Sequence, residues 1–374
     1  MITIVFTGGG TGGHIYPGLA VIDELKKKED VDVCWIGNSK GMDRNIVTEY
    51  GVAFYGIPSG KLRRYFSLQN LRDVFLIIAG FFSSIRILRR VKPALVFSKG
   101  GFVSVPPCRA AKFLHIPVIT HECDFSPGLA TRINARSASA IFVSYEATRE
   151  AFPERMRSKV TVTGNPVRFA FYTASAVRGR EFLQCTKIDK PILLILGGSL
   201  GARQINDLIA TCIDELCKRF IVVHQTGIQN ADQIVFQENP VVKAYYRPYA
   251  FIRMEMPDVL AASSLVIGRS GANTVWECAS AGKPMILIPL EKGSSRGDQV
   301  ENARYFVAAG AAMMLTGTDV SKETLLDRIA EIYSDSGIYD AMAQKAAALG
   351  NVRPAPYIAD LLVHFSTEKN GVGR

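Results

Sequence analysis

The chain has 374 residues, enough for two domains or one large one. Hydrophobic residues make up 48% and charged residues 21%, a balance typical of a packed soluble protein. The formal charge of +10 suits negatively charged partners: nucleic acid, an anionic membrane face or a phosphorylated substrate.

The seven cysteines form no C-x-x-C pair and stand mostly among apolar neighbours. They are therefore predicted to be reduced core residues, and a zinc site is not expected. The chain begins directly with a strand pattern, which predicts that no signal peptide is present and that the protein is cytoplasmic.

The first strong motif is a glycine turn between a strand and a helix. Residues 2–6 form a β-branched and aromatic run, Thr7–Gly13 is rich in glycine, and Pro17 opens an amphipathic stretch. This arrangement points backbone N–H groups at a phosphate. The second strand, residues 31–36, carries no acid at its tip to bind a ribose hydroxyl, so a phosphate- or sugar-bearing ligand is favoured over NAD or FAD. His14 would lie beside that ligand.

Strands and helices then alternate along the chain, which predicts parallel sheets covered by helices on both faces. The predicted first-half elements are strands at 94–97, 117–120, 140–143 and 160–163, helices at 103–114 and 129–136, and turns at 98–101 and 121–126.

Residues 61–92 differ from the rest of the first half. They hold eight basic residues against the single acid Asp73, and an apolar run, 74–82, too short to span a bilayer. Two interpretations stand side by side without excluding each other: a core helix with a solvated basic face, or a basic amphipathic segment on an anionic membrane.

The pattern restarts after residues 169–190, which are predicted to be a helix plus a connection. The second-half prediction is a strand at 191–196, a glycine turn at 197–201, a helix at 202–217, strands at 220–223, 265–267 and 285–288, helices at 272–281 and 298–309, and C-terminal helix from 340 broken near 350–356. Two strand–glycine–helix openings predict two doubly wound domains that face each other across a cleft.

Three residues have both a structural and a functional interpretation. Thr274 and Glu277 have capping-box spacing, yet Glu277 could equally accept both hydroxyls of a ribose. Ser199 could cap a helix or donate to a diphosphate. Arg168, after a tight Asn-Pro turn, could be a surface residue or a cleft cation.

No nucleophile elbow, Walker lysine or H-E-x-x-H motif is found in the sequence. Together with two phosphate-type turns, this favours group transfer from an activated nucleotide, which needs a base for the acceptor and stabilisation of the leaving diphosphate.

Five motifs in order carry a resemblance: Gly9–His14, Gly164–Arg168, Gly197–Gly201, Ser270–Glu277, and Asp298-Gln299 followed by Asn302-Ala303. Over nearly the whole chain, the sequence resembles the bacterial cell-wall glycosyltransferases that add N-acetylglucosamine to undecaprenyl-diphospho-N-acetylmuramoyl-pentapeptide, converting lipid I to lipid II.

The resemblance implies a GT-B fold of two Rossmann-like α/β domains. The N-terminal acceptor and membrane domain would span residues 1–166, with a C-terminal helix at about 353–374 packing back on it, and the UDP-sugar domain would span 167–352. The donor would be UDP-N-acetylglucosamine, with no cofactor and no metal.

The resemblance also implies the site residues. The backbone of Ile252 would contact uracil, Glu277 the ribose, and Asp298 and Gln299 the sugar. The diphosphate would be held by Ser199 and by the helix start Ala272, Asn273 and Thr274. Thr11, Gly12 and Gly13 would face the donor sugar and the acceptor diphosphate, and Arg168 would belong to the donor site.

The family turn His-Glu-x-Asn reads His121-Glu-Cys-Asp124 here. Asp124 can accept from a sugar hydroxyl but cannot donate while ionised. The expected reaction is direct displacement with inversion by the C4 hydroxyl of the muramoyl sugar. His14 is the first-choice base, because a helix N-terminus disfavours its protonated form, and Asp124 is the other candidate.

The lipid acceptor favours peripheral attachment at the cytoplasmic face of the membrane through residues 61–92, and cell-wall synthesis or division proteins are conceivable partners. Alternatives are another GT-B enzyme, such as a lipid glycosyltransferase, or a UDP-N-acetylglucosamine 2-epimerase. A nucleic-acid-binding module is disfavoured, because no recognisable RNA or DNA motif is present.

Overall fold

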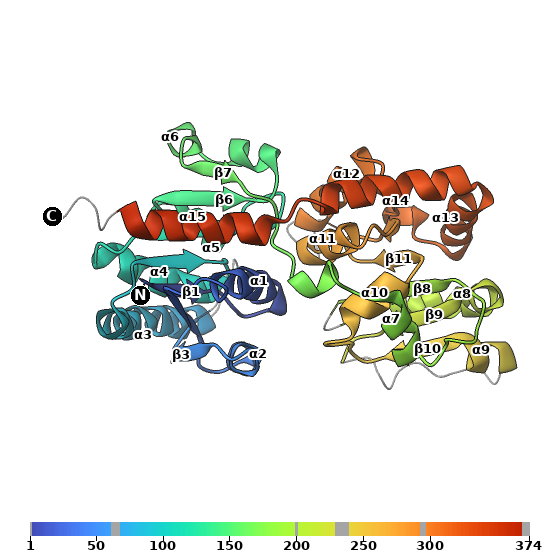
Figure 1. Cartoon of the computed structure of the whole chain (residues 1–374), viewed down its shortest axis with the longest axis horizontal. Helices are drawn as coiled ribbons and strands as arrows, with labels where there is room; N and C mark the ends of the chain where they lie inside the picture. The colour runs from blue at the N-terminus through green and yellow to red at the C-terminus, as the bar shows by residue number, and fades with distance from the viewer. Residues whose placement is uncertain (1, 61–67, 199–200, 229–238, 292–296, 369–374) are drawn as a thin grey trace. The chain divides into compact units, whose positions relative to one another are not determined.

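The structure is a computed structural model that describes residues 2–60, 68–198, 201–228, 239–291 and 297–368. The chain divides into two compact units (Figure 1). Unit 1 runs to Arg168 and takes in the C-terminal residues from Arg353, and unit 2 is Phe169–Val352.

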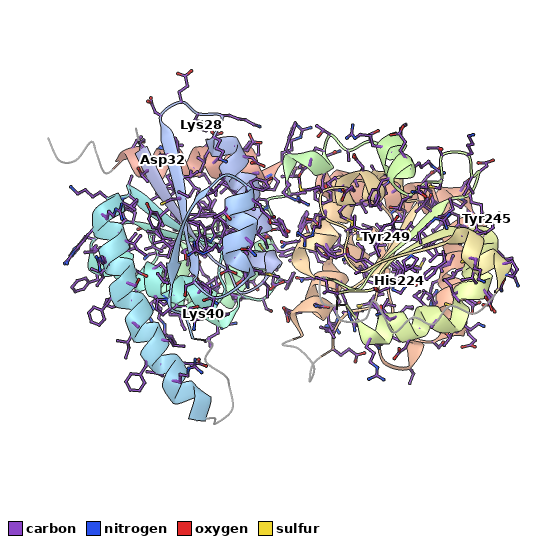
Figure 2. All side chains as sticks on the ribbon, turned by 90° about the horizontal axis from the view of Figure 1, so that it is seen from below. Lys28, Asp32, Lys40, His224, Tyr245 and Tyr249 are labelled. Carbon is purple, nitrogen blue, oxygen red and sulfur yellow. The ribbon has the colours of Figure 1, made fainter. Side chains whose placement is uncertain are left out.

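The described part of unit 1 is built on a parallel sheet in the order β3-β2-β1-β4-β5-β6-β7. The strands are β1 Ile2–Thr7, β2 Val31–Asn38, β3 Ala53–Ile57, β4 Leu95–Ser98, β5 Val118–Glu122, β6 Ala140–Val143 and β7 Val160–Val162. Lys28 and Asp32 lie at one end of β2 and Lys40 at the other (Figure 2).

Helices cover both faces of this sheet. They are α1 Tyr16–Leu25, α2 Met42–Glu49, α3 Leu68–Val91, α4 Val105–Phe113, α5 Leu129–Ala135, α6 Glu154–Arg157 and α15 Pro354–Glu368, with short 3-10 turns η1 Gly12–His14, η2 Phe102–Ser104 and η3 Glu146–Ala151. Alternate residues of each strand point to opposite faces. Ile4 and Phe6 accordingly pack with α1 and α15, whereas Val5 packs with α3 and α4.

The described part of unit 2 repeats the plan with the sheet order β10-β9-β8-β11-β12-β13. Its strands are β8 Ile192–Leu196, β9 Ile221–Gln225, β10 Tyr246–Tyr249, β11 Leu265–Gly268, β12 Met285–Leu287 and β13 Ala312–Met314. Its helices are α7 Ala176–Phe182, α8 Arg203–Arg219, α9 Pro240–Tyr245, α10 Met256–Ala262, α11 Ala272–Ser280, α12 Asp298–Ala308, α13 Lys322–Ser334 and α14 Ser336–Gly350, with 3-10 turns η4 Phe169–Phe171 and η5 Gly317–Asp319.

Both sheets reverse their strand order beside the first strand, between β1 and β4 and between β8 and β11. In open α/β sheets, ligands bind outside the carboxyl ends of the strands at such a reversal. The predicted doubly wound architecture is therefore confirmed, and it singles out two edges: one beside Thr7 and Ser98, the other beside Leu196 and Gly268.

Some local predictions were wrong. His121 and Glu122 end strand β5 and do not lie in the turn that follows it. The C-terminal helix is interrupted only at 351–353, because Pro354 is tolerated in a first helical turn. The seven cysteines are buried and free, as predicted.

Candidate functional site

His14 lies at the carboxyl edge of the unit 1 sheet, where two glycine turns meet. It ends the 3-10 turn η1 and therefore lies just before α1. The second turn, Gly100-Gly101, follows β4 and has both φ angles near +80°, a region that favours glycine. A Cβ on Gly101 would lie 2.5 Å from the Gly9 carbonyl oxygen and 2.9 Å from the His14 ring, so only glycine fits there.

The His14 ring is oriented by a backbone carbonyl. Its Nδ1 atom lies 3.2 Å from the carbonyl oxygen of Lys99. A carbonyl can only accept, so Nδ1 donates and the lone pair of the neutral imidazole resides on Nε2. This is the tautomer that a general base acting through Nε2 needs.

The Lys99 side chain runs into the interior beneath this turn. Its Nζ atom lies 2.7 Å from Nδ1 of His121 and 3.2 Å from Sγ of Cys123, and His121 Nε2 donates to the Gly164 carbonyl at 3.0 Å. Burial lowers the pKa of Lys99. Burial and the nearby Lys99 together lower the pKa of His121 to well below its usual range. Burial also raises the pKa of the Cys123 thiol to about 11. The hydrogen bonds of this cluster join β4, β5 and the Gly164 turn.

The two acids at the end of β5, Glu122 and Asp124, lie in different surroundings. Glu122 is nearly fully buried, and its two carboxylate oxygens accept from the backbone N–H groups of Asp124 and Gly128 at 3.1 and 2.9 Å. Glu122 thus shapes the turn, whereas the side chain of Asp124 is half-buried.

Arg168 belongs to unit 1 in this structure. Its guanidinium carbon lies 5.0 Å from the centre of the Tyr16 ring at the start of α1, a cation–π distance. The arginine therefore lies next to the helix that follows the first glycine turn. Of the predicted residues there, Thr11 and Gly13 are exposed and Gly12 is half-buried.

Unit 2 has a hollow of about 490 Å³ at the strand reversal. Its lining comes from the glycine turn after β8, the turn after β11, and the loop and helix start beyond β12: Leu196, Gly197, Gly198, Gly201, Ala202, Arg203, Gln204, Arg269, Gly271, Thr274, Leu290 and Gln299. Two predicted site residues, Thr274 and Gln299, are among them.

Glu277 does not form the capping box that its spacing allowed. The cap of α11 is Gly271, and Thr274 already lies inside the helix. Glu277 is half-buried in the second turn of α11. Ala272 and Asn273 form the first turn, where the helix N-terminus favours negative charge.

The other predicted donor residues are already engaged within unit 2. The Ile252 N–H donates to Gln225 Oε1 at 2.9 Å. The backbone carbonyl of Ile252 is therefore the group left for a pyrimidine. Gln299 accepts from the Leu290 N–H at 3.0 Å, and Asp298 begins α12 beside it. Ser199 lies outside the described residues.

Sequence reasoning missed Arg269 and Lys99 as members of these two edges. Arg269 lines the unit 2 hollow and donates to the Ile288 carbonyl and to Gln204 at 2.8 and 3.0 Å. Each of the two directly follows the last residue of a strand at the reversal point, and that position was the available signal.

The described residues hold neither a metal-binding cluster nor a membrane-spanning helix. No group of three or more His, Cys, Asp or Glu side chains there could hold a metal ion. Among the helices that the structure describes, none has the length and apolar character needed to cross a membrane.

Two doubly wound units in one chain, each with a glycine turn at its strand reversal, define the architecture of a GT-B glycosyltransferase. Comparison with known proteins makes this specific. Residues 4–143 match the N-terminal domain, and residues 192–358 the C-terminal domain, of glycosyltransferase family 28, and the chain belongs to that family.

A Treponema denticola protein named UDP-N-acetylglucosamine–N-acetylmuramyl-(pentapeptide) pyrophosphoryl-undecaprenol N-acetylglucosamine transferase is 54% identical over 99% of both chains. The solved structure of Acinetobacter baumannii MurG superposes with a TM-score of 0.73 at 25% identity, over 96% of this chain and 99% of that one. A putative UDP-N-acetylglucosamine 2-epimerase from Listeria monocytogenes has a TM-score of 0.69 at 14% identity, over 98% of this chain and 97% of that one, which shows a shared fold only.

Proposed function

We propose that the protein transfers N-acetylglucosamine from UDP-N-acetylglucosamine to the muramoyl sugar of undecaprenyl-diphospho-N-acetylmuramoyl-pentapeptide, the step from lipid I to lipid II in peptidoglycan synthesis. The observation that carries this proposal is the 54% identity, over 99% of the chain, to the Treponema denticola protein that is named as this transferase.

We assign the donor to unit 2. The hollow beside β8 and β11 supports this assignment, because it combines a glycine turn, the N-terminus of α11 and the cation Arg269. These groups suit a diphosphate. Glu277 would accept the ribose hydroxyls, the Ile252 carbonyl would accept from uracil, and Asp298 and Gln299 would contact the sugar. Ser199, Ala272, Asn273 and Thr274 would surround the diphosphate.

We assign the acceptor and the base to unit 1. The C4 hydroxyl oxygen attacks the anomeric carbon, the bond from that carbon to the UDP oxygen breaks, and the hydroxyl proton passes to His14 Nε2. The hydrogen bond from His14 Nδ1 to the Lys99 carbonyl supports His14 as the base. It fixes the tautomer of the ring and stabilises the imidazolium that forms. Thr11, Gly12 and Gly13 would contact the acceptor diphosphate and the donor sugar.

Asp124 remains a second candidate base, and Arg168 a candidate donor-site cation. UDP leaves with negative charge on its terminal phosphate. The N-terminus of α11 and Arg269 are the groups of unit 2 that we propose to stabilise that charge.

We further propose that unit 1 rests on the cytoplasmic face of the membrane through α3. Its exposed side chains support this proposal. Val74, Phe75, Ile78 and Phe82 are 42 to 66% exposed, and Arg86, Arg89 and Arg90 are exposed towards its C-terminal end. Ring-bearing side chains project outward from this helix (Figure 2). The opposite face packs Ile85 and Leu88 into the core, so the helix that we propose to face the membrane is also a core helix.

The proposed reaction is tested by incubating the protein with radiolabelled UDP-N-acetylglucosamine, with and without a soluble lipid I analogue. Label should move to the acceptor only when both substrates are present, and labelled UDP-glucose should transfer poorly. Conversion of the donor sugar to its 2-epimer without acceptor would instead identify an epimerase.

A further inference from the structure

The first glycine turn is held in shape by a carboxylate from the next strand–helix connection. Asp43 has no exposed surface, and its Oδ1 atom accepts from the Gly10 N–H at 3.0 Å. Its Oδ2 atom accepts from the Asn38 N–H, also at 3.0 Å. Hydrogen bonds to an ionised acceptor are among the stronger ones in proteins, and here both acceptor oxygens are used.

The glycines of the turn match this carboxylate. Gly9 and Gly10 have φ angles of +156° and +84°, which side chains rarely adopt. A Cβ on Gly9 would overlap the Asp43 carboxylate, so glycine at this position makes room for it. Asp43 itself lies in the first turn of α2, where a helix N-terminus favours a negative charge.

The bonds of Asp43 connect the ends of two neighbouring strands. Asn38 ends β2 and Gly10 follows β1, and β2 pairs in parallel with all of β1, from Ile2 to Thr7. The turn then continues into η1, where the His14 N–H donates to the Thr11 carbonyl at 3.1 Å. The position of Gly10 therefore determines where the chain places Thr11 and His14.

The same carboxylate limits what the turn can bind. The Gly10 N–H, which a phosphate would otherwise use, is already bonded to an anion. A second negative group at that end of the turn would be repelled by the buried carboxylate. Substrate contacts are thus directed to the Thr11–Gly13 half of the turn.

We propose that Asp43 is a positioning residue of the acceptor site: it fixes the first glycine turn in one conformation and directs the acceptor to its Thr11–Gly13 half. The inference rests on the proposed function, because it assigns this turn to the acceptor. Asp43 itself touches no reacting atom.

The test is Asp43→Asn, which keeps the shape but turns an amide N–H2 towards one of the two N–H donors. We expect kcat/KM for a soluble lipid I analogue to fall about 10- to 100-fold, since small displacements of positioned groups have effects of that order. The affinity for UDP, which lacks the sugar that Thr11–Gly13 would contact, should stay within twofold. Amide hydrogen exchange of residues 8–15 should become faster.

Asp32→Asn is the matched control. Asp32 also accepts a backbone N–H, that of Val33 at 2.8 Å, but it lies at the other end of β2 from Lys40 (Figure 2). This variant should leave both kinetics and exchange at residues 8–15 unchanged. Gly9→Ala is the second test, because its Cβ displaces the carboxylate while keeping the charge. It should reproduce the loss of kcat/KM for the acceptor analogue with unchanged affinity for UDP.

The inference is overturned if Asp43→Asn has wild-type acceptor kinetics, if its affinity for UDP falls as strongly as its kcat/KM for the acceptor, or if exchange at residues 8–15 is unchanged. Failure of both Asp43→Asn and Gly9→Ala to fold would make Asp43 a folding residue only, and would also contradict it. If the wild-type protein transfers no sugar, the proposed function fails by itself, and the exchange measurement still decides whether Asp43 holds the turn.

Discussion

His14 is the proposed general base, and its Nδ1 atom is held by the Lys99 carbonyl. His14→Ala should lower kcat by about 10²–10⁴, the usual effect of losing a general base, with donor affinity unchanged. Asp124→Asn is the matched variant, since it removes the other candidate base while keeping the side-chain shape. It should retain kcat within about tenfold. Steady-state kinetics with both substrates measures both variants, and the opposite ranking would make Asp124 the base.

Glu277 should act on donor binding. If its carboxylate accepts ribose hydroxyls, Glu277→Ala should raise the KM for UDP-N-acetylglucosamine about 10- to 100-fold, because a hydrogen bond to a charged group contributes about 1.5–3 kcal/mol. The KM for the acceptor should not change. Glu323→Ala, on the exposed start of α13, is the control and should have wild-type kinetics. An unchanged donor KM for Glu277→Ala would remove Glu277 from the donor site.

His224 should make the stability of unit 2 depend on pH. It lies inside unit 2 (Figure 2), with Nδ1 2.9 Å from the Tyr246 hydroxyl and Nε2 3.1 Å from Asn206 Oδ1. Burial lowers the pKa of His224 from 6.5 to about 4. His224 therefore binds a proton near pH 6.5 in the unfolded chain but only near pH 4 in the folded protein. Stability is lost as the pH falls from 6.5 towards 4.

Between pH 7.5 and pH 5 this histidine alone should lower the free energy of unfolding by about 2 kcal/mol. The lowered pKa of His121 acts in the same direction. Urea titrations at several pH values measure the loss. His224→Gln should be less stable at pH 7.5 but should have a shallower pH dependence below 6.5, and an unchanged slope would show that His224 is not responsible.

Residues in short sequence motifs could be predicted as site residues, whereas residues whose role depends on contacts far along the chain could not. Glycine, histidine and glutamate in short motifs were visible because the turns that they form are local. Asp43 and Lys99 were not singled out, because their partners lie 33 and 22 positions away and only the sheet brings them together. The capping interpretation of Thr274 failed for a related reason: a spacing cannot tell which residue begins a helix.

At the scale of elements, α3 carries the prediction about the membrane. Phe75→Ser with Phe82→Ser should weaken binding to phosphatidylglycerol vesicles, and charge reversal of Arg86, Arg89 and Arg90 should do the same and remove its salt dependence. Val177→Ser, an apolar side chain of α7 that is 65% exposed, is the control and should bind like wild type. Vesicle sedimentation measures all three, and wild-type binding by the α3 variants would exclude this helix as the contact.

The elements themselves could be predicted where the hydrophobic pattern is long and continuous. The buried strands β1, β8 and β11 and the helices after the glycine turns belong to this group. The segments α2, β3, β10 and α10 gave no such signal. Strand β3, for example, is half-exposed with only Ile57 fully buried, so its sequence lacks the apolar run of a central strand. Pairing with β2, rather than its own composition, makes it a strand.

At the scale of the whole molecule, the last helix shows that a unit is not a continuous stretch of sequence. Helix α15 begins at residue 354, yet Ile358 and Leu362 are fully buried in the core of unit 1 with α1 residues such as Leu19 (Figure 1). The chain thus leaves unit 1 once and returns to it. In the proposed reaction, unit 2 binds the donor and unit 1 binds the acceptor, so neither unit should transfer sugar alone.

The central claim is direct displacement of UDP by the acceptor sugar, and the product of one reaction tests it. The donor carries its sugar in the α configuration, so a single displacement must give a β linkage to the C4 oxygen of the muramoyl sugar. Nuclear magnetic resonance of the product from UDP-N-acetylglucosamine and a lipid I analogue should show that β linkage. An α-linked product, or no linked product under conditions in which the protein binds both substrates, would contradict the account.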